Sequence, residues 1–194
     1  MNFNLILASS SQSRKEILNK LEIPFTCKAP DIDETPKENE TPDQLVARLS
    51  YEKAFKIFQE NPTSVVIGSD QIAILEGEIL GKPSCYQNAR AQLAKQSGKM
   101  ILFKTGLCLL SPFGANKQYG FAETKVYFRN LTDKTIEKYL NKEKPYSAAG
   151  SLKAEGLGIA LLEKIEGEDP NTLIGLPLIM LTTFLKNIGI DLPN

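Results

Sequence analysis

The chain has 194 residues, of which 42% are hydrophobic, and its 23 basic residues equal its 23 acidic residues in number. A sizeable core is therefore expected, and no excess charge attracts nucleic acid or a membrane surface. The absence of histidine excludes Ser-His-Asp and Cys-His centres, so proton transfer would fall to Asp, Glu, Lys, Tyr or metal-bound water.

Apolar runs and helix caps alternate along the first half of the chain. Short strands are predicted from the apolar runs, over residues 4–8, 25–29, 65–69 and a hairpin at 72–80 around Glu76-Gly77. A capping box at Ser13 and Glu16 predicts a short helix. A second capping box at Thr41 and Gln44 predicts a long helix that continues to about residue 60.

The second half of the chain carries longer apolar runs. Residues 100–111 and 117–130 flank a turn and predict two long antiparallel strands. Further helices are predicted over about 84–98, 132–142 and 177–189. Helices that alternate with strands, followed by a long hairpin, indicate an α/β class with a mixed sheet in one unit with a cleft.

The cysteines and the hydropathy of the chain bear on its compartment. Cys27, Cys85 and Cys108 form no CxxC pair, which argues against a disulfide framework and suits a reducing cytosol. No apolar stretch reaches the length of a membrane span, and the N-terminal run is too short for a signal sequence. We therefore expect a soluble cytoplasmic protein without a nucleic-acid or membrane partner.

The serine-rich stretch ASSSQSRK, residues 8–15, joins the first predicted strand to the first helix. Backbone N–H groups at a helix start, serine hydroxyls and the charge of Arg14 could together bind phosphate. The stretch lacks the glycines and the GK[ST] ending of a P-loop. The alternative is a plain helix cap followed by a solvated arginine.

Charged residues of two neighbouring segments could take part in a site. The acidic stretch DIDE, residues 31–34, could hold a hard divalent cation through carboxylate oxygens, or it could be a solvated loop. Lys53 lies on the predicted 42–60 helix, and taken alone it is best explained as a solvated helix lysine.

Asp70 directly follows the strand predicted at 65–69. Ligands gather at the carboxyl ends of strands in open α/β sheets, so a carboxylate there could bind metal or accept a proton from water. A carboxylate is a weak base at neutral pH, and a metal that acidifies its bound water removes this mismatch. Lys82 follows the hairpin and could neutralise a phosphate in the same cleft. The alternatives are a turn aspartate and an exposed lysine.

Residues 147–177 contain five glycines, and Glu155 stands among them. Gly150, Gly156 and Gly158 allow the backbone to approach a ligand closely. A guanine base presents N1–H and N2–H donors side by side, and one carboxylate can accept from both. The alternative for Glu155 is a surface glutamate in a glycine-rich turn.

Seven stretches span nearly the whole chain in order: LILASSSQSR, DIDE, YEKA, VVIGSDQ, GEILGKP, AAGSLKAEGLGI and DPNTLIGLPL. Together they resemble the Maf family of nucleoside triphosphate pyrophosphatases. The resemblance implies a Maf/ITPase-like fold over residues 1–194 as a single domain, with an elongated mixed β-sheet flanked by helices and two lobes around a central cleft. It also implies cleavage between the α and β phosphates with a divalent metal, Mg²⁺ or Mn²⁺, and a possible homodimer.

The resemblance assigns roles to residues of this chain. Asp70 corresponds to the proton acceptor, and Glu34 and Asp70 correspond to the metal site. The positions expected to line the phosphates and the metal are Ser9, Arg14, Glu34, Lys53 and Lys82. Whether Asp70 itself removes a proton or positions a metal-bound hydroxide is left open by the sequence.

Three positions associated with base specificity are Ser13, Gln71 and Glu155. Members that act on dTTP and UTP tend to carry threonine and glutamine where this chain has Gln71 and Glu155, so the chain resembles the 7-methyl-GTP subgroup. Glu155 suits both the guanine edge and the positive charge of a methylated base. An aromatic residue can occupy the third position in this subgroup, whereas Ser13 cannot stack on a base. The alternatives are dTTP, UTP or another non-standard nucleotide as substrate, or a nucleotide-binding regulator of cell division.

Overall fold

The computed structural model describes residues 3–114 and 116–192 of the chain. Contacts divide the chain into two units. The first unit comprises Met1–Asp70, Thr105–Ala122 and Asp169–Asn194, and the second comprises Gln71–Lys104 and Glu123–Glu168. That residues 1–194 form a single domain stays a prediction.

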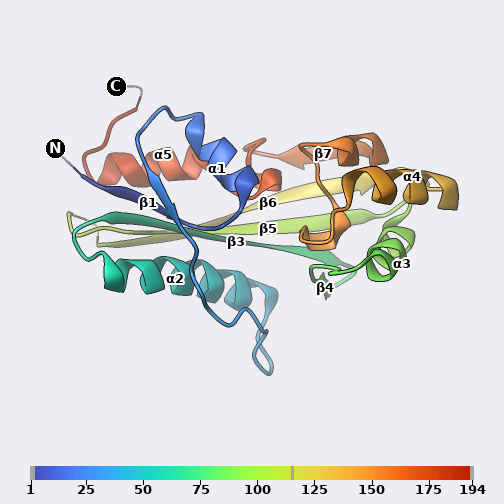
Figure 1. Ribbon diagram of the computed structural model, residues 1–194, viewed down its shortest axis with the longest axis horizontal. Coiled ribbons are helices and arrows are strands. Elements are labelled where there is room, and N and C mark those ends of the chain that lie inside the picture. The colour runs from blue at the N-terminus through green and yellow to red at the C-terminus, as the bar shows by residue number, and fades with distance from the viewer. Residues whose placement is uncertain (1–2, 115, 193–194) are drawn as a thin grey trace. The chain divides into compact units, whose positions relative to one another are not determined.

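The strands of the described residues belong to one mixed sheet. They are β1 (Leu5–Ala8), β2 (Thr26–Lys28), β3 (Val65–Leu75), β4 (Glu78–Leu80), β5 (Met100–Leu110), β6 (Lys117–Phe128) and β7 (Leu162–Gly167). In the described part of the chain these seven strands follow the order β2-β1-β3-β5-β6-β7, and β4 pairs with β3 (Figure 1). β1 is parallel to β2 and β3, whereas the β3–β4 and β6–β7 pairs are antiparallel.

Helices flank the sheet, which confirms the predicted α/β class with a mixed sheet. They are α1 (Gln12–Asn19), α2 (Pro42–Glu60), α3 (Tyr86–Gln96), α4 (Asp133–Glu143) and α5 (Leu178–Asn187), with 3-10 turns η1 (Ala149–Ser151), η2 (Leu157–Leu161) and η3 (Thr172–Ile174). No helix within residues 3–114 and 116–192 is both long enough and apolar enough to cross a bilayer.

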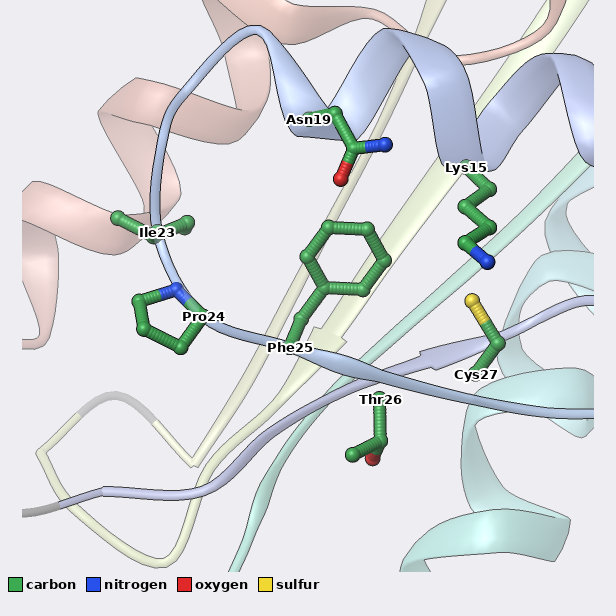
Figure 2. Close-up of a pocket in the computed structure, with 7 residues that line it drawn as sticks. All are labelled: Lys15, Asn19, Ile23, Pro24, Phe25, Thr26 and Cys27. Atoms are coloured by element: carbon green, nitrogen blue, oxygen red, sulfur yellow. The ribbon is translucent and has the colours of Figure 1, made fainter.

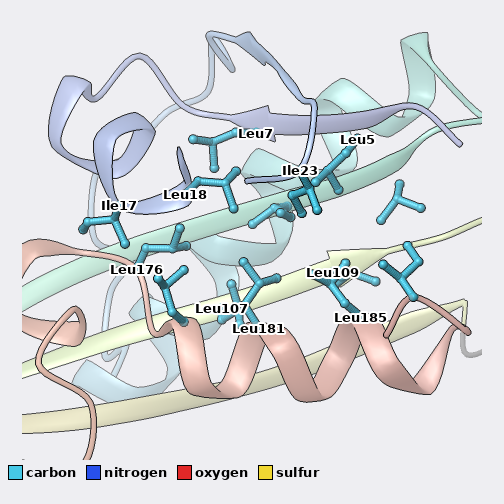
Figure 3. Close-up of a cluster of buried hydrophobic side chains, with 14 of the residues drawn as sticks. Leu5, Leu7, Ile17, Leu18, Ile23, Leu107, Leu109, Leu176, Leu181 and Leu185 are labelled. Atoms are coloured by element: carbon cyan, nitrogen blue, oxygen red, sulfur yellow. The ribbon is translucent and has the colours of Figure 1, made fainter. Parts of the chain in front are cut away.

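In the first unit, helices pack on both faces of the sheet. Side chains alternate along β1, so they contribute to a core on each face. Leu5 and Leu7 belong to the core under α1 and α5, while Ile6 and Ala8 belong to the core under α2 (Figure 1). Figure 3 shows the first of these cores, where leucines from β1, α1, β5 and α5 point toward one another. The two helical layers therefore hold β1 and β3 in place between them.

The second unit contains the predicted hairpin. β3 turns back into β4 through Glu76 and Gly77, whose φ values are +51° and +89°. Two successive left-handed residues are typical of the tight turn that suits twisted hairpins, so this prediction is confirmed. β7, which pairs with β6 over Leu162–Gly167, was not expected from the sequence.

Helix starts show where local signals compete. The predicted start of α2 is confirmed, because Thr41 and Gln44 form the capping box. The start at Ser13 is wrong: Ser11 has the extended backbone of an N-cap, and its Oγ accepts a hydrogen bond from the Arg14 amide at 3.3 Å. The helix predicted from about residue 84 starts later, because Ser84 has a φ of +62° and α3 begins at Tyr86.

Two glycines bring α2 unusually close to the sheet. A Cβ on Gly68 would lie 2.3 Å from the Ser50 carbonyl oxygen, and a Cβ on Gly106 would lie 2.4 Å from the Ser50 hydroxyl. The middle of α2 therefore rests on the backbone of β3 and β5. This approach places the next turn of α2, which carries Lys53, beside the stretch of β3 that carries Asp70.

Substituting Gly68→Ala is expected to lower the free energy of unfolding by about 1–3 kcal/mol, because backbone atoms of α2 must move to admit the methyl group. Urea unfolding would measure the change. Gly81→Ala is the matched control, since a Cβ there meets nothing within 4 Å, and its effect should stay within about 0.5 kcal/mol. Equal effects of the two substitutions would contradict close packing of α2 at Gly68.

Candidate active site

A buried lysine bridges two carboxylates in the first unit. Lys53 Nζ lies 2.5 Å from Asp70 Oδ1 and 2.6 Å from Glu34 Oε1. Lys53 is 5% exposed and Asp70 is 6% exposed. Lys53 thus holds the buried carboxylate of Asp70 and that of Glu34, whose side chain is 41% exposed. The solvated lysine that the sequence alone favoured is wrong. We call Glu34, Lys53 and Asp70 the acid–lysine triad.

The position of Asp70 differs from the one expected. β3 does not end at Ser69 but continues to Leu75, so Asp70 lies inside a strand and not in a turn. The last β3 residue that pairs with β1 is Ile67. Asp70 therefore lies three residues beyond the last β3 residue that pairs with β1, in a part of β3 that is still strand.

The loop that carries Glu34 is fixed to α2 by an arginine. Arg48 Nε and Nη2 bind the two oxygens of Glu40 at 2.6 Å and 2.8 Å, and Nη2 also donates to the Thr35 carbonyl at 3.0 Å. Hydrogen bonding from Arg48 lowers the pKa of Glu40 to about 2, so this pair stays charged at neutral pH. The loop is thereby held with Glu34 at Lys53.

The rest of the acidic stretch does not extend the triad. Asp33 Oδ1 accepts a hydrogen bond from the Thr35 amide at 2.9 Å, which is a local turn contact. In the described part of the chain, no three His, Cys, Asp or Glu side chains gather as a metal site would require. Glu34 and Asp70, the two predicted metal ligands, are the carboxylates that meet at Lys53, and that they hold a metal stays a prediction.

The serine-rich turn brings Arg14 to the same place. Ser9 is buried at the end of β1, and its Oγ accepts a hydrogen bond from the Ser11 amide at 3.1 Å. Arg14 Nε donates to the Gly175 carbonyl at 2.8 Å. Burial lowers the pKa of Arg14, while the nearby charges of Asp70 and Glu34 raise it. The charges of these two carboxylates therefore act on Arg14, and the guanidinium keeps its charge.

The Gly175 carbonyl is a junction that the sequence did not reveal. Besides Arg14 Nε, it receives the Ser69 hydroxyl at 3.0 Å, and Ser69 also lies 2.8 Å from the Gly106 carbonyl. Ser69 directly precedes Asp70 and is fully buried. One backbone oxygen thus fixes both the arginine and the residue beside the predicted proton acceptor.

Known proteins resemble this chain over nearly its whole length. The model of the family described as Maf-like protein matches residues 4–188. The chain belongs to the Maf family. It is 52% identical over 190 residues to a protein of Colwellia psychrerythraea named 7-methyl-GTP pyrophosphatase, covering 96% of this chain and 94% of that one.

Two solved structures resemble this Maf chain at low identity. One is the Ham1 protein of Staphylococcus aureus, with a TM-score of 0.44 and 16% identity, covering 66% of this chain and 72% of that one. The other is a nucleoside-triphosphatase, dITP/XTP pyrophosphatase, of Mycobacterium abscessus, with a TM-score of 0.42 and 14% identity, covering 66% and 76%.

Of the remaining predicted residues, Ser13 lies in the first unit, and Gln71, Lys82 and Glu155 lie in the second. Ser13 is half-buried in the first turn of α1, and Gln71 is the β3 residue after Asp70. Lys82 and Glu155 are exposed residues of the second unit. That these two join the triad of this Maf chain stays a prediction.

The tract around Glu155 is held by α4. Glu143 Oε2 accepts a hydrogen bond from the Leu157 amide at 2.8 Å, and the Tyr139 hydroxyl accepts one from the Lys153 amide at 3.0 Å. A Cβ on Gly156 would lie 2.7 Å from Glu143 Oε2, so a larger residue would displace the end of the Glu143 side chain. Glu155 therefore stands on a supported loop.

A surface depression of the first unit is lined by none of the predicted site residues. It measures about 540 Å³, and Figure 2 shows that residues of α1 and β2 line it. Its lining includes Phe25, Cys27 and Lys15 but no carboxylate and no member of the triad. It therefore does not provide the acidic oxygens that metal-dependent hydrolysis needs.

Proposed function

We propose that this chain hydrolyses 7-methyl-GTP to 7-methyl-GMP and pyrophosphate. The observation that carries the chemistry is the acid–lysine triad, in which buried Lys53 holds the carboxylates of Asp70 and Glu34, together with Arg14, on which both carboxylate charges act. The base is proposed from the relative in Colwellia psychrerythraea, which is named for that substrate. A small nucleotide is the partner; a homodimer and a cytoplasmic location complete the proposal.

The residues of the first unit divide the work. Asp70 accepts the proton of the attacking water, and its geometry is set by Lys53. Arg14 is anchored through Nε, so its two terminal nitrogens form the end that meets phosphate. Ser9 lies on the same turn and borders the phosphates. A cation such as Arg14 that contacts the triphosphate stabilises the negative charge that develops on the leaving pyrophosphate.

Maf pyrophosphatases generally depend on a divalent metal, and two residues here fit one. Glu34 and Asp70 meet through a single cation, so two hard oxygen donors already converge. Mg²⁺ is commonly held by one or two carboxylates together with substrate phosphates, which agrees with a pair instead of a full cage. When bound, the metal neutralises phosphate charge and acidifies water.

Residues of the second unit complete the proposal. Lys82 neutralises the triphosphate, and Glu155 reads the guanine edge and complements the charge of the methylated base. Ser13 and Gln71 shape the remaining specificity. If Glu155 does not read the base, dTTP, UTP or another non-standard nucleotide is the substrate of the same reaction.

A panel of 7-methyl-GTP, GTP, dTTP and UTP with Mg²⁺ tests the proposal, with products separated by ion-exchange chromatography. We expect 7-methyl-GTP to give the highest kcat/KM and to yield monophosphate plus pyrophosphate. Diphosphate plus inorganic phosphate would show that the bond cleaved is not the proposed one.

The same panel applied to Glu155→Gln isolates base recognition. Loss of one accepting oxygen and of the charge should lower the preference for 7-methyl-GTP over UTP by about tenfold or more. Glu163→Gln, at an exposed glutamate of β7, is the matched control and should leave the preference unchanged. An unchanged preference in Glu155→Gln would remove Glu155 from the base site.

A further inference from the structure

We propose that Asp169 is a positioning residue of the active site, acting through the Gly175 carbonyl on Arg14. This inference rests on the proposed function. Asp169 is 5% exposed, and both of its carboxylate oxygens accept hydrogen bonds from the protein. It carries no phosphate-binding or metal-binding role above, so its burial and its partners need another explanation.

Both oxygens of Asp169 hold the segment that follows it. Oδ1 accepts hydrogen bonds from the Asn171 backbone amide and from Asn171 Nδ2, each at 2.8 Å. Oδ2 accepts from the Ile179 amide at 2.8 Å, in the first turn of α5. Pro177 stands at the N-cap of α5 and makes no side-chain cap, so Asp169 supplies the cap from ten residues upstream. The carboxylate therefore clamps both ends of the 171–179 segment.

The clamped segment presents the Gly175 carbonyl. Its turn is closed by hydrogen bonds from the Gly175 amide to the carbonyls of Thr172 at 3.0 Å and Asn171 at 3.2 Å. The Thr105 hydroxyl donates to the same Thr172 carbonyl at 3.0 Å, which ties the turn to β5. These contacts leave the Gly175 oxygen to receive Arg14 and Ser69.

The backbone conformation of Gly175 and its lack of a side chain allow Arg14 to approach the turn closely. Its φ is +120°, and a Cβ there would lie 3.2 Å from Arg14 Nε. The guanidinium therefore packs directly on the turn, and its direction follows the direction of the carbonyl. A shift of the turn moves the oxygen that accepts from Arg14 Nε and from the Ser69 hydroxyl.

Substitution Asp169→Asn tests the clamp with little change of shape. An amide has one accepting oxygen where the carboxylate has two, so at least one of the three donors loses its acceptor. Loss of a supporting partner commonly costs about 10- to 100-fold in activity, and we expect a fall in kcat/KM for 7-methyl-GTP in that range.

The decisive measurement is a double-mutant cycle with Arg14→Met. If Asp169 acts through Arg14, Asp169→Asn should cost less than about threefold in the Arg14→Met background. Equal costs in the two backgrounds, or no cost in the wild type, would overturn the inference. If Asp169→Asn does not fold, Asn171→Ala takes its place, because it removes one hydrogen-bond donor to Asp169. Its fall in kcat/KM should be smaller and should likewise shrink in the Arg14→Met background.

Lys20→Met is the matched control. Lys20 Nζ donates to Asn171 Oδ1 at 2.7 Å on the surface, so its loss touches the segment but removes none of the three hydrogen bonds to Asp169. It should leave kcat/KM within about twofold, and a loss equal to that of Asp169→Asn would overturn the inference by showing that any change to the segment suffices.

Calorimetric titration with inorganic tripolyphosphate separates this inference from the proposed function. The clamp predicts that Asp169→Asn binds tripolyphosphate more weakly than the wild type does. It also predicts that Asp169→Asn/Arg14→Met binds it as well as Arg14→Met alone. This result supports the clamp even if no nucleotide is hydrolysed. An active wild type whose tripolyphosphate affinity and kcat/KM are both indifferent to Asp169→Asn overturns the clamp and leaves the proposed function standing.

Discussion

Asp70→Asn is expected to lower kcat by about 10²- to 10⁴-fold, with a much smaller change in KM for the nucleotide. The amide keeps the size of the side chain and an oxygen for Lys53, but it can neither accept a proton from water nor contribute a charge to a metal. Steady-state kinetics with 7-methyl-GTP and Mg²⁺ would measure the loss. Circular dichroism melting would show that the variant is folded.

The control for this experiment is Asp191→Asn, an exposed aspartate near the C-terminus, which should retain wild-type kinetics. If Asp70→Asn keeps more than about a tenth of the wild-type kcat, Asp70 is not the proton acceptor. The same variant separates an enzyme from a nucleotide-binding regulator of cell division, because a regulator that needs only binding would keep its cellular effect.

Lys53→Met should lower the free energy of unfolding by roughly 3 kcal/mol in the absence of metal, because it leaves two carboxylates without their shared cation. Lys53 is 5% exposed, so water cannot readily replace the lost charge. Mg²⁺ should return part of this stability, since the ion can stand between Glu34 and Asp70. Urea unfolding with and without Mg²⁺ would measure both effects.

The wild type should gain less stability from Mg²⁺ than Lys53→Met does, because Lys53 already occupies the place between the carboxylates. Lys56→Met is the matched control on the same helix. Its partner Glu60 lies 3.5 Å away on the surface, so the loss should stay below about 0.5 kcal/mol. A Mg²⁺ response that persists in Lys53→Met/Glu34→Gln would place the metal elsewhere.

The elements that could be predicted are those whose signals are local. The capping box at Thr41 and the apolar spacing after it determine α2 within a few residues. Glu76-Gly77 determines the hairpin between β3 and β4. Ser11 and Ser13 could each act as the N-cap of α1, and the outcome depends on the backbone direction as the chain leaves β1. The sequence pattern alone predicted Ser13, whereas the N-cap is Ser11.

The candidate site also has a part that the sequence predicted and a part that it did not. Residue types and motif order were enough to identify a family and to select Asp70, Glu34, Lys53 and Arg14 as candidates. The support of these residues was not visible, because Asp169, Gly175 and Arg48 act through backbone atoms and through partners distant in sequence. A buried carboxylate that caps a helix ten residues away has no local pattern.

By itself the sequence determined the class of fold, the extent of most strands and helices, and the chemical groups available for hydrolysis without histidine. Only the tertiary structure decided that Lys53 is a buried bridge and not a solvated lysine, and that Asp70 lies inside a strand. The reason is that α2 approaches the backbone of β3 at Gly68, and such an approach depends on the shapes of two elements together.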